Sequence, residues 1–236
     1  MPKAYDQWIV TPHGPIEKIA ENLWRVAAKF PGAPIDREMI LVRLPDGRIV
    51  VHNAIALGDA EMKEIETWGT PSFLIVPNGG HRLDARIWKT RYPGIRVVAP
   101  PAARQKVEQV VAVDDTAPDF GSSGVRYQMF DGTEGREGVL VVPSSSGTSL
   151  VFTDVLMNMH KLPGFGGFMM GLAGFVTKAP RVTFPARMAL VKNKVAMREE
   201  LGKLAETPGL ARLYFSHGVP VIEGAGAALR EAAAAL

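Results

Sequence analysis

The chain has 236 residues, of which 47% are hydrophobic and 22% charged. This is the composition of a packed globular protein, and it excludes disordered and low-complexity classes. The absence of cysteine excludes a disulfide scaffold, a thiolate zinc site and a cysteine nucleophile, and it fits a reducing compartment. A net charge of +3 is too small a surplus to indicate a nucleic-acid partner.

The first half of the chain alternates predicted strands and helices. Pro45-Asp46-Gly47 is a turn signal between two apolar runs, so residues 38–52 are predicted to form a β-hairpin. The other predicted elements are a strand over 22–28, a helix over 60–68, a strand over 72–76, a helix over 82–92, a strand over 95–99 and a helix over 100–111. This strand–helix rhythm predicts an α/β layer.

The second half returns to strands before it ends in helices. We predict strands over 125–130, 138–142, 150–153 and 212–216, and helices over 186–206 and 225–236. The Ser- and Gly-rich residues 143–149 predict a second hairpin turn. No linker or internal repeat interrupts the chain, so we expect one domain over residues 1–236.

Three of the five histidines stand where predicted strands end. His52 closes one strand, His81 follows the next by a few residues, and His217 directly follows the last strand. Asp154 also follows a strand. Because ligands bind beyond the carboxyl ends of strands in open α/β sheets, these four side chains are candidates for one site. Two histidines and a carboxylate can hold a divalent metal, whereas the alternative is that each merely hydrogen-bonds loop backbone.

Four stretches resemble motifs of the metallo-β-lactamase superfamily, and in particular an uncharacterised family of degenerate members. They are Gly47-Arg-Ile-Val-Val-His-Asn-Ala-Ile55, Leu74-Ile-Val-Pro-Asn-Gly-Gly-His81, Gly147-Thr-Ser-Leu-Val-Phe-Thr-Asp154 and Tyr214-Phe-Ser-His-Gly218. The resemblance covers about residues 20–225. It implies a four-layer αββα sandwich with a site at the strand ends between the two sheets.

The departures from the superfamily pattern reduce the number of metal ligands that the chain can supply. The superfamily motif is His-x-His-x-Asp-His, whereas this chain has Asn78-Gly-Gly-His81-Arg-Leu-Asp84 there. No histidine lies between His81 and Asp154. The resemblance implies that the remaining metal ligands are His81, Asp154 and His217. These three could hold one divalent ion such as zinc, iron or manganese, or the site could hold no metal. His52, Asn53 and Asn78 are expected to line the site.

Two functions are compatible with these residues. One is a metal-dependent hydrolase with a single ion and an unknown substrate. The other is a non-catalytic small-molecule-binding or interaction protein that has lost the metal centre. The stretch from Lys178 to Arg212 has eight basic residues against three acidic ones, which indicates either a solvated helix face or attraction of an anionic ligand.

The segment 157–177 is rich in glycine, methionine and phenylalanine. It is too short to span a bilayer, and the N-terminus lacks a signal peptide, so we expect a cytoplasmic protein with no membrane span. Five glycines make a regular helix costly. We expect the segment to fold over the cleft, to pack against a second subunit in a homodimer, or to be a plain buried loop.

Overall fold

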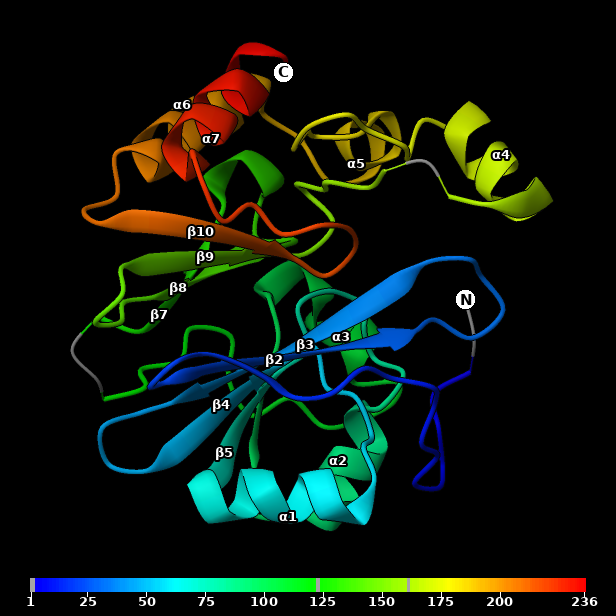
Figure 1. Ribbon diagram of the computed structural model, residues 1–236, viewed down its shortest axis with the longest axis vertical. Helices are drawn as coiled ribbons and strands as arrows, with labels where there is room; N and C mark the ends of the chain where they lie inside the picture. Colours follow the sequence, from blue (N-terminus) through cyan, green and yellow to red (C-terminus); the bar gives the residue numbers. More distant parts are fainter. Residues whose placement is uncertain (1–2, 122–123, 161) are drawn as a thin grey trace.

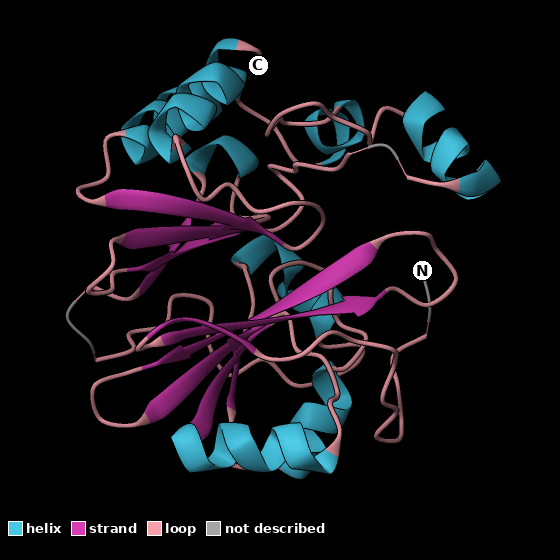
Figure 2. Cartoon of the chain, viewed as in Figure 1, coloured by secondary structure: helices cyan, strands magenta, loops and turns pink. Residues whose placement is uncertain are grey.

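Two β-sheets lie face to face in the computed structural model, which describes residues 3–121, 124–160 and 162–236 (Figures 1 and 2). The larger sheet has six strands in the order β1-β2-β3-β4-β5-β6. Their bounds are β1 (Glu17–Ala20), β2 (Leu23–Lys29), β3 (Asp36–Arg43), β4 (Arg48–His52), β5 (Thr70–Ile75) and β6 (Arg96–Val98). The smaller sheet has the order β10-β9-β8-β7. Its strands are β7 (Arg126–Met129), β8 (Gly138–Val142), β9 (Thr148–Phe152) and β10 (Leu210–Phe215).

Strand direction follows the length of the connections. The predicted hairpin over 38–52 is confirmed, because β3 and β4 pair antiparallel and Gly47 takes the left-handed conformation of the turn, with φ at 84°. The pair β8–β9 is also antiparallel. The longer connections give the parallel pairs β4–β5, β5–β6 and β9–β10. The chain therefore leaves β4, β5 and β6 at one common edge of the larger sheet.

Helices cover the outer faces of both sheets. Their bounds are α1 (Asp59–Trp68), α2 (Ala85–Arg91), η1 (Pro101–Ala103), α3 (Arg104–Val107), η2 (Asp131–Thr133), α4 (Gly164–Leu172), α5 (Phe184–Ala189), α6 (Lys194–Ala205) and α7 (Ala225–Ala234). In Figure 1, α1 and α2 lie below the larger sheet, and α6 and α7 lie above the smaller one. No helix within the described ranges is both long and apolar enough to cross a membrane.

Three apolar clusters fill the spaces between four layers. One packs α1 and α2 against Ile49, Val51 and Leu74. A second lies between the sheets and includes Val50 and Phe73, and a third joins α6 and α7 to the smaller sheet. Neighbouring residues of β4 thus enter clusters on opposite faces, as the period of a strand requires. The predicted αββα sandwich is confirmed.

The predicted helix over 186–206 is divided into α5 and α6. Thr183 caps α5 by accepting a hydrogen bond from the Ala186 amide, and Asn193 caps α6 by accepting one from Ala196. The amides of Lys192 and Asn193 bond the carbonyl of Gly132 instead of a preceding helical turn. Both caps are side-chain oxygens at helix starts, which is the usual role of threonine and asparagine.

Although its glycines make a regular helix costly, the segment 157–177 forms α4 over Gly164–Leu172, most of which is exposed, so the alternative of a plain buried loop is wrong for this part. A Cβ at Gly167 would lie 2.2 Å from the Leu162 carbonyl oxygen, so glycine permits a close approach there. The helix ends in a Schellman motif, in which Gly174 has φ of 80° and the Phe175 amide bonds the Met170 carbonyl. Lys161, which belongs to the same predicted segment, lies outside the described residues.

Candidate metal centre

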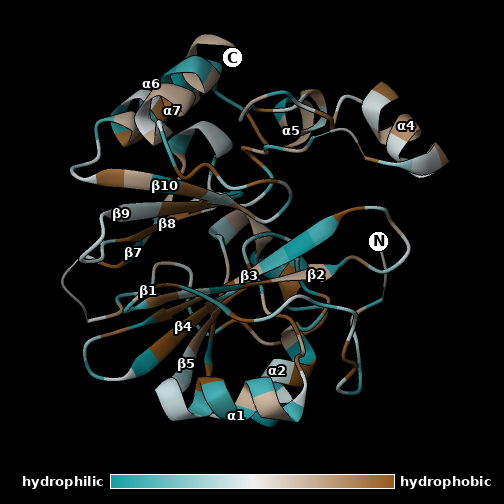
Figure 3. Cartoon of the chain, in the orientation of Figure 1, coloured by the Kyte–Doolittle hydropathy of each residue, from teal (hydrophilic) through white to brown (hydrophobic). Residues whose placement is uncertain are grey.

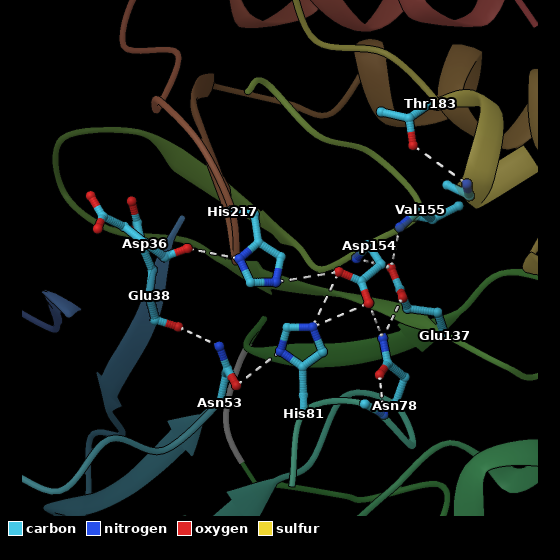
Figure 4. A network of polar contacts seen from close by, with 12 residues as sticks. Asp36, Glu38, Asn53, Asn78, His81, Glu137, Asp154, Val155, Thr183 and His217 are labelled. Carbon is cyan, nitrogen blue, oxygen red and sulfur yellow. Dashed lines mark hydrogen bonds and ion pairs between the residues drawn. The ribbon is translucent and has the colours of Figure 1, made fainter. Parts of the chain in front are cut away.

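His81, Asp154 and His217 meet beyond the carboxyl ends of β5, β9 and β10 (Figure 4). His81 Nε2 lies 3.1 Å from each carboxylate oxygen of Asp154. His217 Nε2 lies 3.6 Å from Asp154 Oδ1. One potential ligand atom from each of the three residues lies within 4.8 Å of the others. The cluster joins the two sheets, since β5 belongs to the larger sheet and β9 and β10 to the smaller.

The second nitrogen of each imidazole is already bound to the protein. His81 Nδ1 lies 3.0 Å from Asn53 Oδ1, and Asn53 in turn donates its Nδ2 to the Glu38 carbonyl at 2.7 Å. His217 Nδ1 lies 2.8 Å from the Asp36 carbonyl. Both oxygens can only accept, so each ring carries its hydrogen on Nδ1. The Nε2 atoms of both rings are therefore directed at one carboxylate, which they can bond only through a proton or a shared cation.

Asn53 and Asn78 orient the side chains of His81 and Asp154, respectively. Asn53 directly follows β4 and has φ of 57°, a left-handed conformation that asparagine tolerates better than most residues. Asn78 donates to Asp154 Oδ2 at 2.8 Å and to Glu137 Oε2 at 3.0 Å, while its own Oδ1 accepts from the Gly80 amide. Both asparagines border the cavity described below.

Glu137 holds the backbone that carries Asp154. It is fully buried, and its Oε1 accepts from the amides of Asp154 and Val155 at 2.9 and 2.7 Å. Burial, with the nearby Asp154 charge, raises the pKa of Glu137 to about 8. No sequence pattern distinguished this glutamate, because its partners are 17 or more residues away along the chain.

The electrostatics of the cluster favour an ionised Asp154. Burial opposes the charge, but His81 and then His217 hold the pKa of Asp154 well below its usual value. Burial lowers the pKa of His217. In His81 burial acts in the same direction, but the Asp154 carboxylate outweighs it and raises the pKa. A carboxylate faced by two imidazoles is suited to hold positive charge.

The structure leaves His52 apart from the other three residues. It is fully buried, and its ring lies edge-on to Tyr127 at 6.3 Å, between the two sheets. Burial and the neighbouring His81 lower the pKa of His52 to about 3, so it is neutral. Its place two residues after Val50 in β4 puts it on the inter-sheet face, and it does not border the cavity.

Asp84, which stands near the motif position, is already paired. It is buried, forms an ion pair with the buried Arg37 and accepts a hydrogen bond from the Ala56 amide at 3.1 Å. The Asp84 carboxylate therefore stabilises the fold and is not available as a metal ligand. Arg37 itself borders the cavity.

A cavity of about 700 Å³ opens over the cluster. Its wall is mostly apolar, and the larger side chains in it are Phe30, Ile35, Leu83, Met157, Met159, Met170, Phe175 and Leu190. Lys106 and Arg136 also line it. Within the described part of the chain neither of these two side chains is in a salt bridge. Met170 and Phe175 come from the segment 157–177, so part of that segment borders the cleft.

Comparison with solved structures identifies the fold. The structure of the DIM-1 metallo-beta-lactamase is similar, with a TM-score of 0.64 and 12% identity over 96% of this chain and 99% of that one. A metallo beta lactamase from Erythrobacter litoralis with beta mercaptoethanol in the active site is similar at a TM-score of 0.61 and 14% identity, over 94% and 96% of the two chains. No protein-family model matches the sequence, and no curated protein does. The chain therefore has the metallo-β-lactamase fold.

Proposed function

We propose that the protein is a hydrolase that uses one divalent metal ion held by His81, Asp154 and His217. The observation that carries the proposal is the convergence of two Nε2 atoms on one carboxylate while both Nδ1 atoms donate to fixed oxygens. Metal-binding histidines characteristically donate their other ring nitrogen to a carboxylate, carbonyl or amide oxygen, which orients the ring and sets its tautomer. The donor set suits zinc, iron or manganese.

A cation bound by such ligands polarises the bond to be cleaved and lowers the pKa of water. The protein residues would supply positioning. Asn53 and the Asp36 carbonyl orient the two imidazoles, and Asn78 with Glu137 orients Asp154. The apolar wall of the cavity would exclude water around a substrate, and Lys106 and Arg136 would favour an anionic small molecule.

A single ion fits this chain better than a pair. In the described residues, three groups form the one cluster with metal-ligating geometry. Asn78 and Gly80 occupy the stretch where the superfamily motif has histidines, and Asp84 is committed to Arg37. The similar solved structures are named as metallo-β-lactamases. From them we propose for this chain only the reaction class, hydrolysis, and no substrate.

The second candidate is a non-catalytic binding protein that keeps the fold without a metal. It is favoured by the contact of His81 Nε2 with both oxygens of Asp154 at 3.1 Å. A protonated His81 would satisfy this contact with no ion present. The large cavity would then bind a small molecule without chemistry.

The test is hydrolysis by metal-depleted and metal-reloaded protein, with panels of amides, thioesters and phosphodiesters. We expect turnover of one class after reloading, abolished by Asp154→Asn and unaffected by His13→Ala, a variant of a partly exposed histidine outside the cluster. If neither preparation hydrolyses any class, and the protein binds no metal in excess zinc, the hydrolase proposal is wrong and the binding protein is favoured.

A further inference from the structure

The chain from Val155, just after Asp154, to the second turn of α6 contains no acidic residue. Residues 155–198 include seven of the 27 Lys and Arg but none of the 24 Asp and Glu. The seven are Lys161, Lys178, Arg181, Arg187, Lys192, Lys194 and Arg198. The rest of the protein is consequently net acidic. The stretch holds α4 and α5, which stand out at one side of the molecule (Figures 1 and 3).

Helix α4 turns an apolar face toward solvent. Phe165, Phe168, Met169 and Leu172 are exposed by 79, 59, 47 and 68%. They occupy positions i, i+3, i+4 and i+7, and therefore share one face of the helix. Side chains of this size gathered in one exposed patch mark an interaction surface.

Helix α5 also exposes apolar side chains. Phe184 and Met188, which are four residues apart, are exposed by 59 and 64%. The two helices lie close together, because a Cβ at Gly174, just after α4, would be 3.3 Å from the Phe184 Cβ. We call these six side chains of α4 and α5 the apolar patch.

The opposite side of this unit already has a partner inside the protein. Met170, Phe175, Ala186 and Leu190 line the cavity over the metal centre, and Gly166 approaches the ring of Pro34 in the loop between β2 and β3. The apolar patch is therefore a second, outward face, which the described residues of this chain do not cover.

Exposed cations occur in the chain between α4 and α5 and just after α5. Lys178, Arg181, Lys192 and Lys194 are exposed, and none of them is in a salt bridge within the described residues. Arg187 lies over the ring of Phe184, at 5.7 Å. Phenylalanine and leucine side chains beside unpaired lysines and arginines are the composition of helices that lie in the interface of anionic membranes.

We propose that the apolar patch docks on an anionic lipid surface, with α4 in the plane of the interface. The nine residues of α4 would extend only about 14 Å, less than half the hydrocarbon thickness, so the helix lies on the bilayer rather than across it. The lipid acyl region accepts the phenylalanines, and the phosphates and carboxylates of the headgroups neutralise the cations. A second copy of the chain is a poorer partner, because a symmetric contact would bring like charges together.

This proposal goes beyond the proposed hydrolase and is tested without any activity. The full-length protein is mixed with phosphatidylcholine vesicles, with or without phosphatidylserine, and the bound fraction is measured by flotation. We expect binding to the phosphatidylserine vesicles at least about tenfold tighter than to phosphatidylcholine alone, and weaker binding in high salt. Phe168→Ser/Leu172→Ser should lower the affinity about tenfold or more, since both side chains are already exposed and the fold should persist.

Two matched controls separate the patch from general surface effects. Ile222→Ser removes an equally exposed apolar side chain from outside the patch and should leave binding unchanged. Lys178→Glu/Lys192→Glu should weaken binding, whereas Lys203→Glu, an exposed charge on α6, should do so much less. Absence of binding to either vesicle, or equal binding to both, would overturn the proposal. So would a wild-type dimer in sedimentation that Phe168→Ser/Leu172→Ser converts to a monomer, because the occupant would then be a second copy.

Discussion

His81 and Asp154 connect the two sheets through one contact: Nε2 of the histidine lies 3.1 Å from both oxygens of the carboxylate. The histidine follows a strand of the six-stranded sheet, and the aspartate follows a strand of the four-stranded sheet. Because Asn53 contacts His81 and Asn78 contacts Asp154, the pair is positioned by the loops that follow three strands, β4, β5 and β9. Such preorganisation favours binding of an ion over adaptation to many ligands.

Asn53 is expected to act as a positioning residue for the metal. Asn53→Gly keeps the left-handed backbone but removes the acceptor for His81 Nδ1. We expect zinc affinity to fall about 10- to 100-fold, with a loss of about 1 kcal/mol in the free energy of unfolding from the lost bond to the Glu38 carbonyl. Isothermal titration with zinc and urea denaturation measure the two effects. An unchanged zinc affinity would show that the ring is oriented without Asn53.

The buried ion pair of Arg37 and Asp84 should show strong coupling. Arg37→Met leaves the buried Asp84 without its counter-charge, at an expected loss of about 3–5 kcal/mol in the free energy of unfolding. In Arg37→Met/Asp84→Asn the charge is gone and the asparagine oxygen can still accept from the Ala56 amide, so most of the loss should be recovered. Urea denaturation of the single and double variants provides the comparison. A double variant less stable than Arg37→Met alone would contradict the pairing.

Glu38 should make the protein less stable as the pH rises. Burial raises the pKa of this carboxyl from 4.5 to about 7, and Arg25 only partly offsets it. The folded state therefore binds the proton more tightly than the unfolded state, and the free energy of unfolding falls between about pH 4.5 and 7. Glu38→Gln should be about 1–3 kcal/mol more stable than wild type at pH 8 and no more stable at pH 4. The control Glu17→Gln alters the exposed partner of Arg25, and a matching gain there would contradict the assignment.

Two glycines of α4 should respond in opposite ways to alanine. At Gly167 a Cβ would meet the Leu162 carbonyl at 2.2 Å, whereas at Gly171 the nearest atom is 3.8 Å away. Gly171→Ala should stabilise α4 by about 0.5–1 kcal/mol through helix propensity. Gly167→Ala should destabilise it despite the same gain. Rates of limited proteolysis within α4 report the difference, and equal protection in both variants would refute the close approach.

Local signals were sufficient to predict the strands other than β1 and to identify His81, Asp154 and His217 as candidate ligands. Strands such as 138–142 are continuous apolar runs, and His81, Asp154 and His217 stand visibly after strands. Their convergence follows from strand order, which the resemblance supplied. The sequence did not show which face of β4 points toward the site, so His52 was a candidate together with these three residues. His52 lies two residues after Val50 and shares its face of the strand, between the two sheets.

Contacts between distant parts of the chain could not be predicted. Glu137 and Arg37 resemble ordinary loop or strand charges in the sequence, and only the folded structure brings them to Asp154 and Asp84. In α4 a local rule failed for a tertiary reason: helix propensity disfavours its glycines, but Gly167 is required by the approach of Leu162. Lys106 and Arg136 of the cavity wall likewise carried no sequence signal.

The most direct test of the metal centre is the number of zinc ions retained per chain after equilibrium dialysis, measured by elemental analysis. Wild type and the control His13→Ala should each retain one, and His81→Ala, Asp154→Asn and His217→Ala should each retain much less than one at the same free zinc concentration. Retention of no zinc by the wild type, or of one zinc by all three cluster variants, would contradict the proposal that these residues hold a single ion.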